Sequence, residues 1–296
     1  MTDGKLYHYT DINALYGILT EHELWATSVK FMNDSSEGAL GASQIQKAIR
    51  EIREQYSIGD RARDPDAEQI VRAIDKLHGP NFLDGPYDST EVFVACLSRA
   101  CDEIGQWRAY ARNGFCVEFN ESKLRKSIKE LNQRVVALEE VQYVREKEIK
   151  DLRKQVRKLL KKVAKVRASE FHEGQPIEAL DEENKIYELG HVRKHWAFQQ
   201  EKEVRIVTEG SPGNFRASAD YGLIPFTKLK FAPDSIDAIW VGPNRYGDLQ
   251  AASLQSFAAS NPQVIEYETE EEDGYTTVDY HPHLYSVKRS SVPFRG

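Results

Sequence analysis

Apolar and polar residues follow two periods along this chain, and together they predict a fold that mixes strands with helices. Side chains of a strand alternate between two faces, whereas those on one face of a helix recur every three or four residues. Short alternating or wholly apolar runs predict strands over Lys5–Thr10, Leu24–Phe31, Val92–Leu97, Phe115–Phe119, Glu203–Thr208, Ile236–Val241 and Gln263–Glu268. Helical spacing predicts helices over Ile12–Leu19, Ser36–Tyr56, Asp60–Leu77, Cys101–Ala111 and a segment near Glu182–His195.

These elements indicate an α+β or mixed fold. The strands do not alternate regularly with helices, and the sequence contains neither the glycine signature of a dinucleotide-binding sheet nor a P-loop. A doubly wound parallel sheet is therefore not expected. The length of 296 residues allows one or two domains, and we expect a single α+β domain over residues 1–296.

The stretch 145–167 differs in charge from the rest of the chain. It holds 11 Lys or Arg and 3 acidic residues, a net charge of 11 − 3 = +8, so the remainder carries −7 − 8 = −15. Its apolar residues recur at helical spacing, which predicts a long basic amphipathic helix within a helical insertion at about residues 145–171. Two interpretations stay open: a solvated face over a core, or a phosphate-facing patch for RNA or DNA. The second would use Lys154, Arg157, Lys158, Lys161 and Lys162.

Composition narrows the class of protein further. The net charge of −7 argues against a generic polyanion binder, and no apolar run approaches the roughly 20 residues that cross a bilayer. The first residues show no signal-peptide pattern, and the three cysteines fit no zinc spacing. We therefore expect a cytoplasmic protein with free thiols and no membrane partner.

Carboxylates and aromatic residues supply the candidate chemistry. If Glu201, Glu203 and Arg205 continue one strand, their side chains share a face, and Arg205 can separate two carboxylates that otherwise repel. Trp25, Trp107 and Trp196 each stand beside a polar cluster, which favours a pocket with aromatic walls. The alternatives are a surface strand of mixed charge and tryptophans that anchor the core.

Several segments together resemble a bacterial family called domain of unknown function 2971. They include "LYHYTD", "ILTEHELWATSVKFMNDSSE", "QWRAYARNGFCVEF", "KHWAFQQEKEVRIV" and "IDAIWVGPN". The resemblance covers the chain except roughly Glu51–Tyr87 and the basic helix. The chain departs from the family pattern at Phe198, where a tryptophan is expected, and at Ala109, where a histidine commonly precedes the tyrosine.

That pattern is in turn similar to the ADP-ribosyltransferase superfamily, which implies a split mixed sheet and NAD as the cofactor. The resemblance places His8 in the first motif, Thr27 and Ser28 in the second, and Glu201-Lys-Glu203 in the third. It implies that Glu203 stabilises the ribose cation and that Glu201 serves the acceptor, a protein or a nucleic acid. The remaining residues of the implied NAD site are Tyr9, Thr10, Trp25, Asn33, Trp107, Tyr110 and Arg205, with Asp34 and Glu37 closing a loop or fixing a turn.

Two other functions stay open. Asp34, Glu37, Glu201 and Glu203 could hold a divalent ion in a nuclease, with the basic helix holding RNA or DNA. A non-catalytic protein that senses a ligand through its aromatic pocket is the other. A toxin or antiviral-defence role, with a regulatory or antitoxin protein as partner, is implied only by association with such families and not by particular residues.

Overall fold

The computed structural model describes residues 4–32, 35–58, 64, 66–77, 91–112, 114–133, 135–145, 147–169, 183, 185–186, 189–270, 276–283 and 285–293. The chain forms two compact units. The first unit comprises Met1–Thr27, Val92–Glu139 and Gln200–Gly296, and the second comprises Ser28–Glu91 and Glu140–Gln199. The second unit therefore takes in the predicted insertion together with an earlier stretch of the chain.

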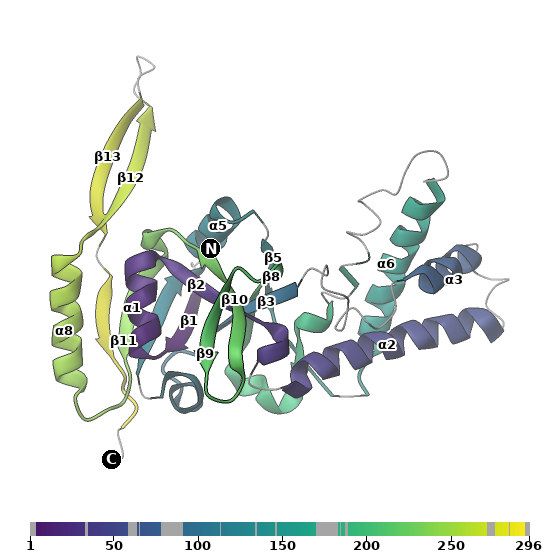
Figure 1. The fold of residues 1–296 in the computed structure, drawn as a ribbon, viewed down its shortest axis with the longest axis horizontal. Helices are drawn as coiled ribbons and strands as arrows, with labels where there is room; N and C mark the ends of the chain where they lie inside the picture. Colours follow the sequence, from purple (N-terminus) through teal and green to yellow (C-terminus); the bar gives the residue numbers. More distant parts are fainter. Residues whose placement is uncertain are drawn as a thin grey trace. The chain divides into compact units, whose positions relative to one another are not determined.

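A ten-stranded sheet organises the first unit (Figure 1). Its strands run in the order β14-β11-β4-β1-β3-β2-β10-β9, and β8 pairs with both β3 and β5. Strand β4 pairs antiparallel with β1 and β11, and β10 with β2 and β9, but β11 and β14 are parallel, so the sheet is mixed. The strands are β1 (Lys5–Thr10), β2 (Glu23–Ser28), β3 (Glu91–Ser98), β4 (Phe115–Asn120), β5 (Val135–Glu140), β8 (Glu203–Gly210), β9 (Asn214–Ser218), β10 (Gly222–Lys230), β11 (Ile236–Val241) and β14 (Ser286–Arg289).

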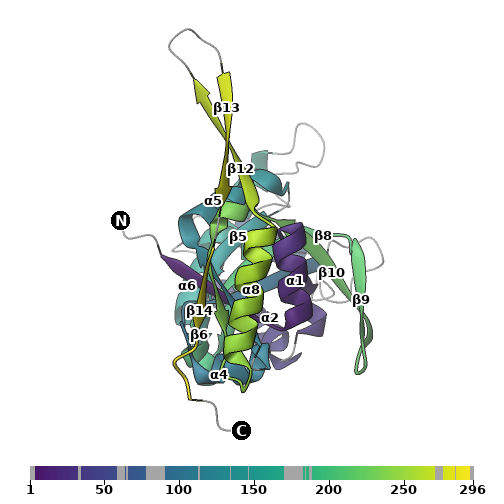
Figure 2. The same cartoon turned by 90° about the vertical axis from the view of Figure 1, so that its left-hand side faces the viewer.

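Three helices pack on one face of this sheet. They are α1 (Ile12–Glu21), α5 (Glu121–Leu131) and α8 (Gly247–Ser260), and α1 lies beside α8 in both views (Figure 2). Alternate strand residues meet them, among them Leu6, Phe93, Val117 and Val204. A short 3-10 turn, Pro233–Ser235, leads into β11. An antiparallel hairpin of β12 (Gln263–Glu270) and β13 (Thr276–His283) follows α8 in the chain.

The opposite face of β1 and β4 carries a smaller cluster. Tyr7, Tyr9 and Cys116 point there because they alternate with the core residues, and they meet Trp107 and Ala111. These last two residues lie on a π-helical turn, Trp107–Ala111, which continues the short helix α4 (Ile104–Gln106). This second layer fixes β1 from its other side.

Three long helices form the core of the second unit in its described residues. They are α2 (Ser35–Ile58), α3 (Ala67–Lys76) and α6 (Lys150–Ser169), joined by the parallel pair β6 (Gln142–Val144) and β7 (Arg193–His195). The apolar face of α6 enters a core of its own with α2 and α3, as its helical spacing requires. The core residues of α6 are Leu152, Val156, Leu160, Val163 and Ala164.

Several sequence-based predictions need correction. The second strand ends at Ser28, and Val29–Phe31 form a 3-10 turn. The helix expected from Cys101 begins at Ile104. The helix expected to reach His195 ends earlier, because Arg193–His195 pair with β6 as a strand. The basic helix is confirmed as α6, and no helix in the described part of the chain combines the length and apolarity needed to cross a membrane.

Candidate functional site

Glu203 and Arg205 form a buried ion pair on β8. Arg205 donates from Nε to Glu203 Oε1 at 2.7 Å and from its terminal nitrogen to Oε2 at 3.1 Å. Both side chains share a strand face, as predicted, while Val204 and Ile206 point into the core. Glu203 is only 6% exposed, so its carboxylate is enclosed by the protein. The carboxylate is oriented by its neighbour, as a charge-assisted bidentate pair requires.

Glu201 does not belong to that strand. It ends the 3-10 helix Trp196–Glu201, and Lys202 adopts a left-handed backbone with φ 44°, so strand alternation does not reach it. The prediction that Glu201, Glu203 and Arg205 share one strand face is therefore wrong for Glu201. Its carboxylate accepts a hydrogen bond from the Tyr110 hydroxyl at 2.9 Å. Two predicted site residues, 91 positions apart, are thus brought together on a partly exposed surface.

His8 lies on β1, next to the neighbouring strand β3. The two strands pair at Tyr7 and Ser98, and the His8 ring nitrogen Nδ1 contacts the Cys96 carbonyl oxygen at 2.9 Å. Burial lowers the pKa of His8, and the hydrogen bond with Cys96 acts in the opposite direction. His8 also shares a face with its cross-strand partner Val117, which belongs to the main core. This is the geometry of a strand histidine that satisfies a backbone carbonyl.

The side chains of Tyr9 and Trp107 are enclosed by other parts of the protein. Trp107 is 0% exposed, stacks edge to face on Tyr9 with ring centroids 4.9 Å apart, and donates from Nε1 to Asp102 at 2.9 Å. Tyr9 donates its hydroxyl to the Ala100 carbonyl at 2.7 Å, and Thr10 is buried. Residues this enclosed do not contact a ligand without rearrangement, so these three predicted NAD contacts fit core roles better.

The second predicted motif is divided by strand alternation. Trp25 is 48% exposed and stacks on Phe226 at 4.4 Å, and Thr27 shares its face. Ser28 is fully buried and donates to the Glu91 carboxylate within the second unit. Asn33 and Asp34 lie outside the described residues, as does the side chain of Glu37.

The metal-ion alternative lacks an assembled site in the described parts of the chain. Among those residues, no group of three or more His, Cys, Asp or Glu side chains could hold a metal ion. Glu201 and Glu203 instead contact Tyr110 and Arg205.

Sequence reasoning missed a buried carboxylate on β4. Glu118 is 4% exposed and accepts hydrogen bonds from Trp240 Nε1 at 2.7 Å and Lys288 Nζ at 2.9 Å. Lys5 lies 3.8 Å from its other oxygen. A lone acidic residue inside the apolar run "FCVEF" was the available signal, because a charge there needs a buried partner. The partners come from three strands, and only the sheet order brings them together.

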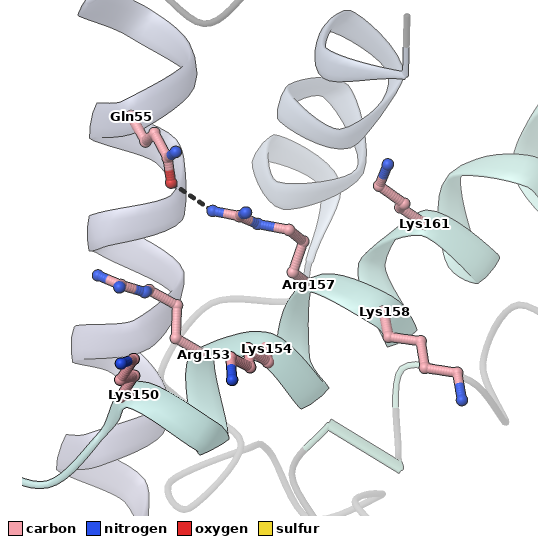
Figure 3. Close-up of a pocket in the computed structure, with 7 residues that line it drawn as sticks. All are labelled: Gln55, Lys150, Arg153, Lys154, Arg157, Lys158 and Lys161. Carbon is pink, nitrogen blue, oxygen red and sulfur yellow. Dashed lines mark hydrogen bonds between the residues drawn. The ribbon is translucent and has the colours of Figure 1, made fainter. Parts of the chain in front are cut away.

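The second unit contains a cationic groove. Six basic side chains of α6 and one residue of α2 line a pocket of about 400 Å³ (Figure 3). Four of the five predicted nucleic-acid contacts are among them. The lining residues are Gln55, Lys150, Arg153, Lys154, Arg157, Lys158 and Lys161.

One row of these cations faces acidic or polar partners. Arg153 lies 2.8 Å from Glu51 on α2. Lys161 lies 3.1 Å from Asp64 and 3.2 Å from Asp66, and the hydrogen bond with Asp64 leads the contacts that raise its pKa. The ends of the row are therefore neutralised locally, although such partly exposed pairs contribute little to stability.

Arg157, in the middle of that row, is placed differently. It donates to the neutral Gln55 amide oxygen, and its guanidinium lies over the Tyr56 ring at 5.6 Å. Its Nε is buried and has no hydrogen-bond partner among the described residues. Within the described residues no carboxylate bonds to this guanidinium, and it lines the groove, so it is suited to receive an anion there.

Fold and groove together define a two-unit α+β protein whose helical second unit carries a cationic groove on α6. Residues 106–206 match the model of the family described as "Protein of unknown function (DUF2971)". The family prediction is confirmed over this segment, which includes α6, although the sequence-based resemblance had left the basic helix out. Neither the curated proteins nor the solved structures that were searched gave a match.

Proposed function

We propose that this protein binds nucleic acid through the cationic groove of α6. The observation that carries the proposal is Arg157, a guanidinium hydrogen-bonded to a neutral amide and flanked by five further cations. Phosphate groups would supply the missing counter-charge. Electrostatic contact with phosphates is the sequence-independent part of nucleic-acid binding, so the groove can act although the whole chain has a net charge of −7.

A purely solvated helix face fits the groove less well. Solvated lysines extend into water and need no enclosing wall, whereas this groove includes Gln55 from a second helix and holds Arg157 against a ring. The apolar side of α6 is sufficient to pack the helix in place, since it fills the core of the second unit. On the cationic side Arg153 and Lys161 pair with acidic residues of the same unit, whereas Lys150, Arg157 and Lys158 pair with no carboxylate among the described residues.

Neutralising the groove tests this function. The triple variant Lys154→Gln, Arg157→Gln and Lys158→Gln is compared with a control that loses the same charge at exposed positions outside the groove, Lys126→Gln, Lys129→Gln and Lys165→Gln. Affinity for labelled DNA and RNA is measured from about 50 to about 200 mM salt. We expect the groove variant to lose affinity and about three units of the log–log salt slope, and the control to change little. Equal losses in both variants, or no binding by the wild type, would refute the function.

We propose NAD-dependent ADP-ribosyl transfer by the first unit as a second candidate. The contact between Tyr110 and Glu201 supports it, since both residues belong to the site that the resemblance implies. In this reaction the bond between ribose C1 and the nicotinamide nitrogen breaks, and nicotinamide leaves with the electron pair. A bond from the acceptor to C1 forms, and Glu201 takes the acceptor's proton.

The buried pair of Glu203 and Arg205 would require Glu203 to act as a fixed negative charge near the ribose cation rather than as an open ligand. Incubation with labelled NAD and cell extract tests the reaction, with nicotinamide release and label in protein, RNA and DNA as separate readouts. Absence of both release and label from the folded wild type would remove this candidate and leave nucleic-acid binding unaffected.

A further inference from the structure

We propose that the α6 groove takes the phosphate backbone of a nucleic-acid duplex, with Arg157 as the anchor for one phosphate and without contact to the bases. This inference rests on the proposed nucleic-acid binding and names its substrate class. It follows from which side chains line the groove, from the state of Arg157 and from the spacing of the outer lysines.

Among the residues that the structure describes, the groove offers no platform on which a base could stack. Its lining is six cations and one amide, and the nearest ring, Tyr56, is only 2% exposed beneath Arg157. Proteins that bind single strands combine a basic groove with exposed aromatic side chains, each of which contributes about 1–3 kcal/mol per stacked base. A site without such rings gains nothing from unpaired bases.

Arg157 is held ready for one anion. Gln55 and the Tyr56 ring restrict the guanidinium before any ligand arrives, so little side-chain entropy remains to be lost on binding. The neighbours in its row, Arg153 and Lys161, already contact carboxylates. An incoming phosphate would therefore meet Arg157 as the strongest uncompensated charge of that row.

Three further lysines of the groove would extend the phosphate contact of Arg157 along α6. Lys150, Lys154 and Lys158 are exposed and lie four residues apart on α6. At 1.5 Å per residue their attachment points repeat every ~6 Å along a straight helix. Attachment points at this regular spacing match the regular phosphates along one strand of a duplex, whose charge density also exceeds that of a single strand.

Fluorescence anisotropy with four probes of equal length tests the inference. The probes are two duplexes of unrelated sequence, one single strand and the same strand made abasic. We expect the two duplexes to bind equally and more tightly than the single strand, and the abasic strand to bind as the single strand does. Tighter binding of the single strand than of the duplexes, or loss of affinity in the abasic strand, would show base contact and overturn the inference.

Three variants test the anchor. Arg157→Gln should weaken duplex binding about tenfold or more, as the loss of a charge-assisted contact does. Arg157→Lys keeps the charge but not the planar fork, so it should fall between wild type and Arg157→Gln. Lys165→Gln removes an exposed charge of the same helix outside the groove and should have the smallest effect. Equal effects of Arg157→Gln and Lys165→Gln would show that Arg157 is no anchor. If no probe binds the folded wild type, the proposed nucleic-acid function itself is wrong, an outcome distinct from binding with the opposite preference.

Discussion

Arg205 donates hydrogen bonds of 2.7 and 3.1 Å to the two carboxylate oxygens of Glu203, which lies two residues earlier on β8. The pair is buried, so each charge depends on the other. Glu203 was the residue that sequence reasoning placed at the centre of catalysis. Its partner makes it also a residue on which the stability of the first unit depends.

Glu203→Gln should lower the free energy of unfolding by roughly 3–5 kcal/mol, because it removes a carboxylate that accepts two hydrogen bonds from the buried Arg205 guanidinium. The measurement is urea unfolding followed by circular dichroism. The double variant Glu203→Gln and Arg205→Met is the control and should recover part of the loss, since neither member of the pair is then charged. A single variant as stable as the wild type would contradict the buried pair. Activity measurements on Glu203 variants need this correction for the folded fraction.

Two variants test the second candidate function. Tyr110→Phe removes the hydrogen bond that orients Glu201, and Glu201→Gln removes the carboxylate that would take the acceptor's proton. Tyr110 is 38% exposed, so losing its hydrogen bond to Glu201 should change stability by less than about 1 kcal/mol. If the unit transfers ADP-ribose, Glu201→Gln should lower transfer about 10²–10⁴-fold while slow release of nicotinamide survives. Tyr110→Phe should have a smaller effect in the same direction. Transfer that is unchanged in a folded Glu201→Gln variant would exclude the acceptor role of this carboxylate.

His8 should make the first unit less stable in mild acid. Burial lowers its folded-state pKa below the ordinary value of 6.5, so the unfolded chain takes up a proton first as the pH falls. Stability is therefore fully present above about pH 6.5 and is lost as the pH falls from there toward the lowered folded-state pKa. His8→Gln keeps a group that can donate to the Cys96 carbonyl but does not titrate. Unfolding free energies compared between pH 8 and pH 5 should fall more steeply for the wild type than for the variant, and parallel curves would contradict the prediction.

Gly242→Ala should disturb the packing of Trp107. A Cβ at Gly242 would lie 2.8 Å from Trp107 Cε3 and 2.9 Å from the Gly114 carbonyl oxygen, closer than packed atoms allow. We expect a loss of about 1–3 kcal/mol and a change in tryptophan fluorescence. Gly213→Ala is the matched control, because nothing lies within 4 Å of its added Cβ, and it should change neither quantity. Equal stability of the two variants would show that the contact with Trp107 is relaxed.

Regular local patterns made part of this fold predictable. β1 was predicted with its observed bounds, and Asp11 caps α1 through hydrogen bonds to the Asn13 and Ala14 amides. The basic helix was predicted because charge and apolar spacing coincide over many residues, so its amphipathic face is specified locally. The helix α8 has a weak periodic pattern and was missed.

The sequence by itself determined the strands and helices with strong periodicity, the mixed α+β class and the cationic face of α6. Only the tertiary structure decided that Glu201 leaves the strand to contact Tyr110, that Glu203 is buried with Arg205, and that Arg157 stands among neutralised neighbours. The physical reason is the sequence distance over which each effect acts. Periodicity acts between residues a few positions apart, whereas these contacts depend on which distant segments pack together, and burial then changes what each charged group requires.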